Sequence, residues 1–231
     1  VVEPSSHMDW HHGPTLLGFL ETVVVDDDTA DGPFRMPVQW VNRPNLDFRG
    51  FSGRIVGGTV RPGDRVRVLP AGTTSTVARI VTMDGDLAEA VAGQSVTITL
   101  ADEIDISRGD VIAEGSKPPQ TSDQLAVHLL WMNDAPMYPG RQYYLKSGAR
   151  TVPCVITELK HTVNVNTMET QPAKSLGLNE VGVANVSLSQ RIAFDAFADD
   201  GELGSFILID RQSNGTVGAG LFDFSLRRAD N

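Results

Sequence analysis

Cysteine, positive charge and long apolar runs are all scarce in this sequence of 231 residues. The single cysteine, Cys154, excludes an internal disulfide framework and a cysteine-rich zinc site. A net charge of −10 disfavours non-specific nucleic-acid binding, because that affinity comes from Lys and Arg neutralising phosphates. No apolar run exceeds four residues, so we predict no membrane-spanning segment. Since no secretory leader pattern opens the chain, we expect a cytoplasmic protein.

Motifs of nucleotide chemistry and acyl transfer are missing as well. The sequence has no G-x-x-x-x-G-K-[ST] loop for phosphates and no G-x-S-x-G nucleophile elbow. Gly218-Ala219-Gly220 is the nearest glycine-rich match, but it lies in an apparent strand, where glycine indicates a bulge or close packing. We therefore predict no catalytic and no cofactor-binding residue in this chain.

Histidine and cysteine do not suggest a metal centre either. His7, Asp9, His11 and His12 form one cluster, but adjacent histidines point apart in regular structure, so an exposed tail is the favoured interpretation. Cys154 stands among apolar neighbours, which predicts a buried thiol with a raised pKa. We predict no metal site.

Residues that favour strands are abundant. Val, Thr and Ile together account for 52 of the 231 residues, and 22 Gly with 13 Pro interrupt them at short intervals. This composition is typical of an all-β protein built from sandwiches or barrels. One helix is expected near the start, where Pro14 would occupy the first helical position and Leu16, Leu17 and Leu20 follow at helical spacing.

The chain divides into three regions. Residues 1–32 contain the helix and an acidic segment that ends it, residues 33–118 form a first β-barrel, and residues 119–231 form a second. A linker rich in proline, residues 115–123, separates the barrels.

Strands follow from alternation of apolar and polar residues. In the first barrel, Met36, Val38 and Trp40 alternate with polar positions, and Val66 with Val68 share one face. Val96, Ile98 and Leu100 are predicted to point inward in a third strand. The second barrel is predicted to contain strands at residues 125–132, 142–145, 151–159, 181–188, 206–209 and 216–224.

Several sequence strings resemble the GTPase subunit, subunit 1, of sulfate adenylyltransferases, a branch of the translation-factor GTPases. Near the start these are Met8-Asp9-Trp10, Gly13-Pro14-Thr15-Leu16-Leu17 and Leu20-Glu21; in the first barrel, residues 36–41, 53–60 and 100–110; in the second, residues 178–182, 205–210 and 216–220. The matches run in order along nearly the whole chain. The resemblance implies two barrels like domains II and III of elongation factor Tu, preceded by a remnant of a GTPase domain.

The resemblance also implies a function. That family couples GTP hydrolysis to the reaction of ATP and sulfate that gives adenylyl sulfate and pyrophosphate, a nucleotidyl transfer performed on a separate catalytic subunit of the heteromer. GTP and Mg²⁺ belong to a domain whose motifs this sequence lacks, so the fragment alone is expected to be inactive. The expected partner is the catalytic subunit; residues 226–231 resemble the junction to a fused adenylylsulfate kinase.

Two alternatives remain from the residues themselves. One is a translation-factor-like module that docks RNA or aminoacyl-tRNA, and the other is a plain protein-interaction module. For an interface with a partner we select exposed residues expected in loops of the first barrel: Arg43, Asn45, Arg49 and Arg54.

Overall fold

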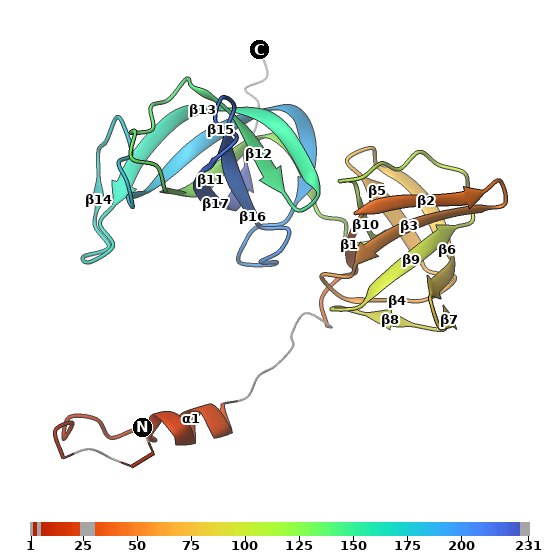
Figure 1. The fold of residues 1–231 in the computed structure, drawn as a ribbon, viewed down its shortest axis with the longest axis horizontal. Coiled ribbons are helices and arrows are strands. Elements are labelled where there is room, and N and C mark those ends of the chain that lie inside the picture. Colours follow the sequence, from red (N-terminus) through yellow and green to blue (C-terminus); the bar gives the residue numbers. More distant parts are fainter. Residues whose placement is uncertain (1, 4–5, 24–30, 227–231) are drawn as a thin grey trace.

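The computed structural model describes residues 2–3, 6–23 and 31–226, and these are almost entirely β (Figure 1). The elements are α1 (Leu16–Thr22), β1 (Arg35–Pro37), β2 (Trp40–Asn45), β3 (Phe48–Arg54), β4 (Thr59–Val60), β5 (Arg65–Leu69), β6 (Thr73–Thr82), β7 (Gly85–Leu87), β8 (Ala90–Val91), β9 (Ser95–Leu100), β10 (Val111–Glu114), β11 (Gln120–Trp131), β12 (Gln142–Ser147), β13 (Arg150–Val163), β14 (Thr170–Gln171), β15 (Val181–Phe194), β16 (Ser205–Asp210) and β17 (Thr216–Ser225).

The helix forms where it was predicted, but it begins later. Thr15 is the N-cap, and its side chain accepts a hydrogen bond from the Gly18 amide at 3.1 Å. Pro14 therefore lies before the cap, so its predicted place at the first helical position is wrong. No residue of α1 is buried, and the acidic residues 26–28 expected to end the helix lie outside the described residues.

The first barrel is a sheet in the order β1-β10-β5-β6-β9-β3-β2, with β7 added to β6. The β1 end of this sheet meets β3 and the residues after it through few bonds: the Gln39 amide, just after β1, donates to the Ser52 carbonyl at 2.9 Å, and Arg35 forms a bridge with Gly57. The side chains of Val66, Val68 and Ile98 are buried, on the strand faces that were predicted to point inward.

Trp40 departs from the predicted alternation. Met36 and Val38 are buried, whereas Trp40 is 60% exposed. The chain leaves β10 at this point and joins β3, because the Val38 amide bonds to the Asp110 carbonyl while the Gln39 amide bonds to Ser52. One predicted strand is therefore two, β1 and β2, with different faces inside.

The second barrel is closed. Six strands run in the order β12-β16-β17-β11-β15-β13, and β12 pairs with β13 along its whole length to complete the ring (Figure 1). All six predicted strands are present, and β13 and β15 extend to 14 residues each. The interior includes Trp131 and Tyr143, in edge-to-face contact at 5.7 Å, and Phe222, stacked on Phe206 at 4.7 Å.

The linker between the barrels is shorter than residues 115–123. Strand β10 ends at Glu114 and β11 begins at Gln120, which pairs with Phe194. The last part of the predicted linker is thus the start of the second barrel, because its backbone groups bond to β15 rather than to water.

Candidate interaction surfaces

A buried arginine joins the two barrels. Arg35 on β1 directs its Nε to the Asp195 carboxylate at 2.8 Å, and its Nη1 donates to the carbonyls of Lys117 at 2.7 Å and Phe34 at 3.1 Å. The side chains of Arg35 and Asp195 are only 5% and 14% exposed. Because an unpaired buried charge is costly, each of these two side chains holds the other in place across the junction.

Further contacts surround this pair. Val56, Leu69, Val111 and Ala113 of the first barrel form an apolar cluster with Leu203 of the second. On another side of the junction, Arg150 donates to Asp110 at 3.2 Å and packs against Gly109, where an added Cβ would come within 2.9 Å of its Cδ. Arg54 pairs with Glu202 at 2.8 Å in a more exposed position. The junction therefore combines apolar burial with charge pairing.

The four residues predicted in exposed loops for a partner interface lie instead in strands β2 and β3, because the chain pairs with itself along this hairpin. Arg49 is only partly exposed, and the four residues do not act alike. Arg54 is engaged by Glu202 of the other barrel, and Arg49 pairs with Asp105 at 3.2 Å while lying over the Phe51 ring. Asn45 caps the hairpin turn by accepting from the Asp47 amide at 3.0 Å. Arg43 is exposed and has no ion-pair partner among the described residues.

Sequence reasoning missed two exposed apolar side chains on the same hairpin. Trp40 is 60% exposed and Leu46 at the turn is 87% exposed. The expected alternation put Trp40 inside, and no sequence signal distinguishes a turn leucine that is solvent-exposed from one that is covered.

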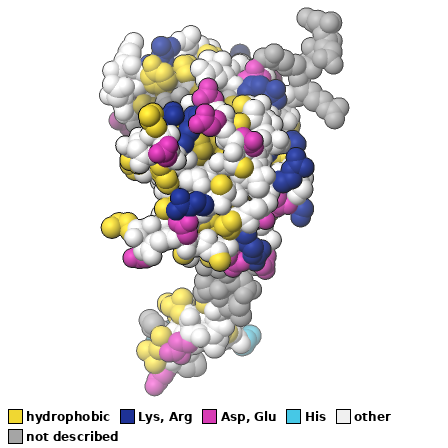
Figure 2. Space-filling model, turned by 90° about the vertical axis from the view of Figure 1, so that its right-hand side faces the viewer, with side chains coloured by type: hydrophobic (Ala, Val, Ile, Leu, Met, Phe, Trp, Pro, Cys, Tyr) yellow, Lys and Arg dark blue, Asp and Glu magenta, His cyan; other side chains and the backbone are white. Residues whose placement is uncertain are grey.

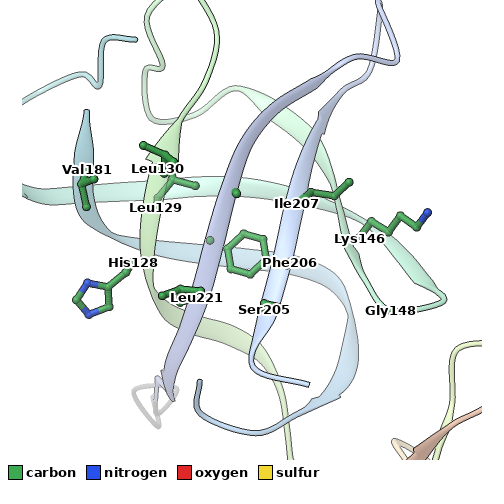
Figure 3. Close-up of a pocket in the computed structure, with 12 residues that line it drawn as sticks. His128, Leu129, Leu130, Lys146, Gly148, Val181, Ser205, Phe206, Ile207 and Leu221 are labelled. Atoms are coloured by element: carbon green, nitrogen blue, oxygen red, sulfur yellow. The ribbon is translucent and has the colours of Figure 1, made fainter. Parts of the chain in front are cut away.

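An apolar groove of about 650 Å³ lies on the outer face of the second barrel (Figure 3). Outward residues from neighbouring strands form its floor in one row, since Val181 is opposite Leu130, Leu130 is opposite Ala219, and Ala219 is opposite Ile207. Lys146 lies at the end of this row. Gly148 lines both the groove and the crevice between the barrels, so the two hollows adjoin.

Glycines in β17 allow neighbouring side chains and backbone to pack closely in this part of the second barrel. A Cβ on Gly220 would lie 2.2 Å from the Phe206 ring, which covers the glycine from inside, and a Cβ on Gly218 would lie 3.0 Å from the Leu130 carbonyl oxygen. The glycine-rich string is therefore a packing feature of β17, as predicted.

No catalytic arrangement emerges among residues 2–3, 6–23 and 31–226. These residues contain no group of three His, Cys, Asp or Glu side chains placed to hold a metal ion. Cys154 is buried, and desolvation raises the pKa of its thiol to about 12, so no thiolate nucleophile is available at neutral pH. Burial likewise raises the pKa of Tyr143.

The surface carries mixed charge. On the face that Figure 2 shows, Lys and Arg side chains are interspersed with Asp and Glu, and no single sign dominates. In the part of the chain that the structure describes, no helix is long and apolar enough to cross a membrane.

Two family models match the two barrels. Residues 51–113 match elongation factor Tu domain 2, and residues 124–223 match the GTP-eEF1A C-terminal domain-like family. Solved structures agree on the fold: sup35 complexed with GDP has a TM-score of 0.79 at 19% identity, with 94% of this chain and 53% of that chain covered.

Relatives match over the whole chain. The bifunctional enzyme NodQ of Azospirillum brasilense is 52% identical over 232 residues, covering 100% of this chain and 37% of the relative. The bifunctional enzyme CysN/CysC of Xylella fastidiosa is 51% identical, covering 98% and 36%, and sulfate adenylyltransferase subunit 1 of Laribacter hongkongensis is 50% identical, covering 96% and 46%. The chain thus spans less than half the length of these relatives.

Proposed function

Since the chain belongs to the sulfate adenylyltransferase subunit 1 family, as its two-barrel region, we propose that it couples GTP hydrolysis in its parent protein to sulfate activation. ATP and sulfate would give adenylyl sulfate and pyrophosphate on a separate catalytic subunit. Identity of about one half along the entire chain carries this proposal. Under this proposal the chain contributes binding contacts and no catalytic group.

The junction between the barrels supports a mechanical role. To transmit a conformational change, the two barrels must move together rather than shift against each other. Packed interfaces with buried charge pairs switch as units. The Arg35–Asp195 pair, the surrounding apolar cluster and the short linker favour a pair of barrels that moves as one body.

The groove on the second barrel suggests where a neighbouring part of the parent rests. The row of Val181, Leu130, Ala219 and Ile207 is apolar and still partly exposed, so covering it would gain free energy. A domain seated there would also reach the crevice between the barrels through Gly148. GTP and Mg²⁺ would be held by that domain.

A fused adenylylsulfate kinase in the parent is part of the same proposal. The names of the NodQ and CysN/CysC relatives describe bifunctional enzymes, which supports a second activity on one polypeptide. Of the junction expected at residues 226–231, residues 227–231 lie outside the described residues.

The test is light scattering after gel filtration of this chain mixed with the catalytic sulfate adenylyltransferase subunit of the same organism. We expect one peak at the mass of a complex, and no saturable binding of labelled GTP to the chain alone at micromolar concentration. Two separate peaks would overturn the docking role, and saturable GTP binding would overturn the assignment of GTP to another domain.

A further inference from the structure

The β2–β3 hairpin presents an unusual set of exposed side chains: Trp40, Arg43 and Leu46, here called the hairpin surface. Trp40 and Leu46 are 60% and 87% exposed. Single exposed apolar residues are ordinary, but Trp and Arg together are the residue types that carry most binding energy in protein interfaces. Trp40 begins β2, Arg43 lies at its register irregularity and Leu46 lies in the turn, so the three span roughly 20 Å of chain, a length within one standard interface.

The free backbone edge of the hairpin is irregular. Strand β2 is the last strand of its sheet and pairs only with β3. The register is interrupted between Asn42 and Asn45, where Pro44 lacks an amide donor. These features prevent another strand from adding to this edge, so a partner would be recognised by the exposed side chains.

The hairpin is basic within an acidic chain. Residues 40–54 contain three arginines and one aspartate, against a net charge of −10 overall. Arg49 and Arg54 are already paired with Asp105 and Glu202. Arg43 is the arginine of this stretch that forms no salt bridge with a described residue. It would attract carboxylates from outside the chain.

Contacts within the hairpin support its shape. The Phe48 ring covers Gly50 so closely that an added Cβ would lie 2.7 Å from its Cε1 atom, and Asn45 caps the turn. A preformed surface loses little conformational entropy on association.

We propose that the hairpin surface docks a protein whose matching face is an apolar pocket bordered by carboxylates. This inference rests on the proposed function, under which that protein is the catalytic sulfate adenylyltransferase subunit. RNA is disfavoured because its phosphates would meet an acidic chain. A second copy is disfavoured because it would bring the same arginine-rich hairpin, with a single aspartate, to both sides of the contact.

The test compares variants of the full chain by titration calorimetry against the catalytic subunit. Trp40→Ala and Leu46→Ala should each weaken binding about 10- to 30-fold, the range of an interface hot spot. Arg43→Glu should weaken binding more at low salt than at high salt. Met83→Ala, at the fully exposed β6–β7 turn of the same barrel, and Tyr138→Ala, at 58% exposure in the other barrel, should bind like the unaltered chain.

The outcomes separate the two proposals. If the unaltered chain binds and the three hairpin variants bind equally well, the hairpin surface is overturned while the proposed function stands. If the unaltered chain does not bind, the proposed function fails and the partner assigned to the hairpin fails with it. A dimer of this chain that Trp40→Ala dissociates, or RNA binding that Arg43→Glu abolishes, would also overturn the inference.

Discussion

The two barrels close in different ways. In the second, six long strands form a complete ring, and the β12–β13 ladder from Gln142–Val155 to Ser147–Arg150 leaves no gap. In the first, the ends of the sheet meet through a few backbone bonds around Gln39 and Arg35, and β2 remains an edge.

This difference in closure suggests a different role for each barrel. A closed ring has no edge to protect and gives a stiff support. The first barrel keeps an exposed hairpin with two apolar side chains and with Arg43, which no described residue pairs. Strand β1, where the irregular closure begins, carries Arg35 into the junction. We therefore interpret the second barrel as the support and the first as the surface that meets a partner.

The largest effect is expected from the junction. Arg35→Met should lower the free energy of unfolding by about 3–5 kcal/mol, because it leaves Asp195 as an uncompensated, mostly buried charge. Urea unfolding should also show the two barrels melting in separate steps. Arg54→Met is the matched control, since its pair with Glu202 is half exposed and should cost less than about 1 kcal/mol. Equal effects of the two variants would contradict this account.

A smaller effect should arise inside the closed ring. Gly220→Ala places a Cβ 2.2 Å from the Phe206 ring, which is itself stacked on Phe222, so overpacking should cost about 1–3 kcal/mol. Gly201→Ala, whose Cβ would find its nearest neighbour at 3.6 Å, is the control. Thermal unfolding followed by circular dichroism measures both, and an unchanged Tm for Gly220→Ala would show that the ring can adapt.

Asp210 tests the turn that joins β16 to β17. Backbone amides of Ser213 and Gln212 donate to its carboxylate and lower its pKa, with a further contribution from Arg141. The stabilisation is therefore present above the ordinary carboxyl pKa of about 3.9 and is lost as pH falls through the lower folded-state pKa.

Asp210→Asn should consequently cost about 1–2 kcal/mol at pH 7 and clearly less at pH 3, as measured by urea unfolding at both values. Asp134→Asn, at an exposed position, serves as control. A cost that does not change with pH would contradict a role for the charged carboxylate.

The smallest effect concerns Cys154, which should not react at all. Its buried thiol, with a pKa raised to about 12, should resist a thiol reagent at pH 8 in the native chain and react once per chain in denaturant. Rapid native labelling would show that the second barrel opens often, against its interpretation as the stiff support.

Local alternation predicted most strands because it records which face each residue buries. Val66 and Val68 are inside as expected, and all six strands of the second barrel are present. The alternation did not reveal that the chain changes neighbours at Gln39, which exposes Trp40. Nor could it reveal the Arg35–Asp195 pair, whose members stand 160 positions apart, since only the folded chain brings them together.

The interface residues show the same limit. Arg43, Asn45, Arg49 and Arg54 were expected in exposed loops of the first barrel, whereas the structure places all four in the paired strands of one hairpin. Their individual partners, including Glu202 from the other barrel, depend on contacts that no local pattern encodes.

The central claim, that two unlike barrels move as one body, is tested most directly by a distance between them. Spin labels at Met83→Cys and Lys160→Cys, both exposed positions, can be measured by pulsed electron resonance while Cys154 stays unlabelled. We expect one narrow distance distribution in the chain alone, unchanged when the catalytic subunit is added, and broadened by Arg35→Met. A broad or two-peaked distribution in the unaltered chain would contradict the account.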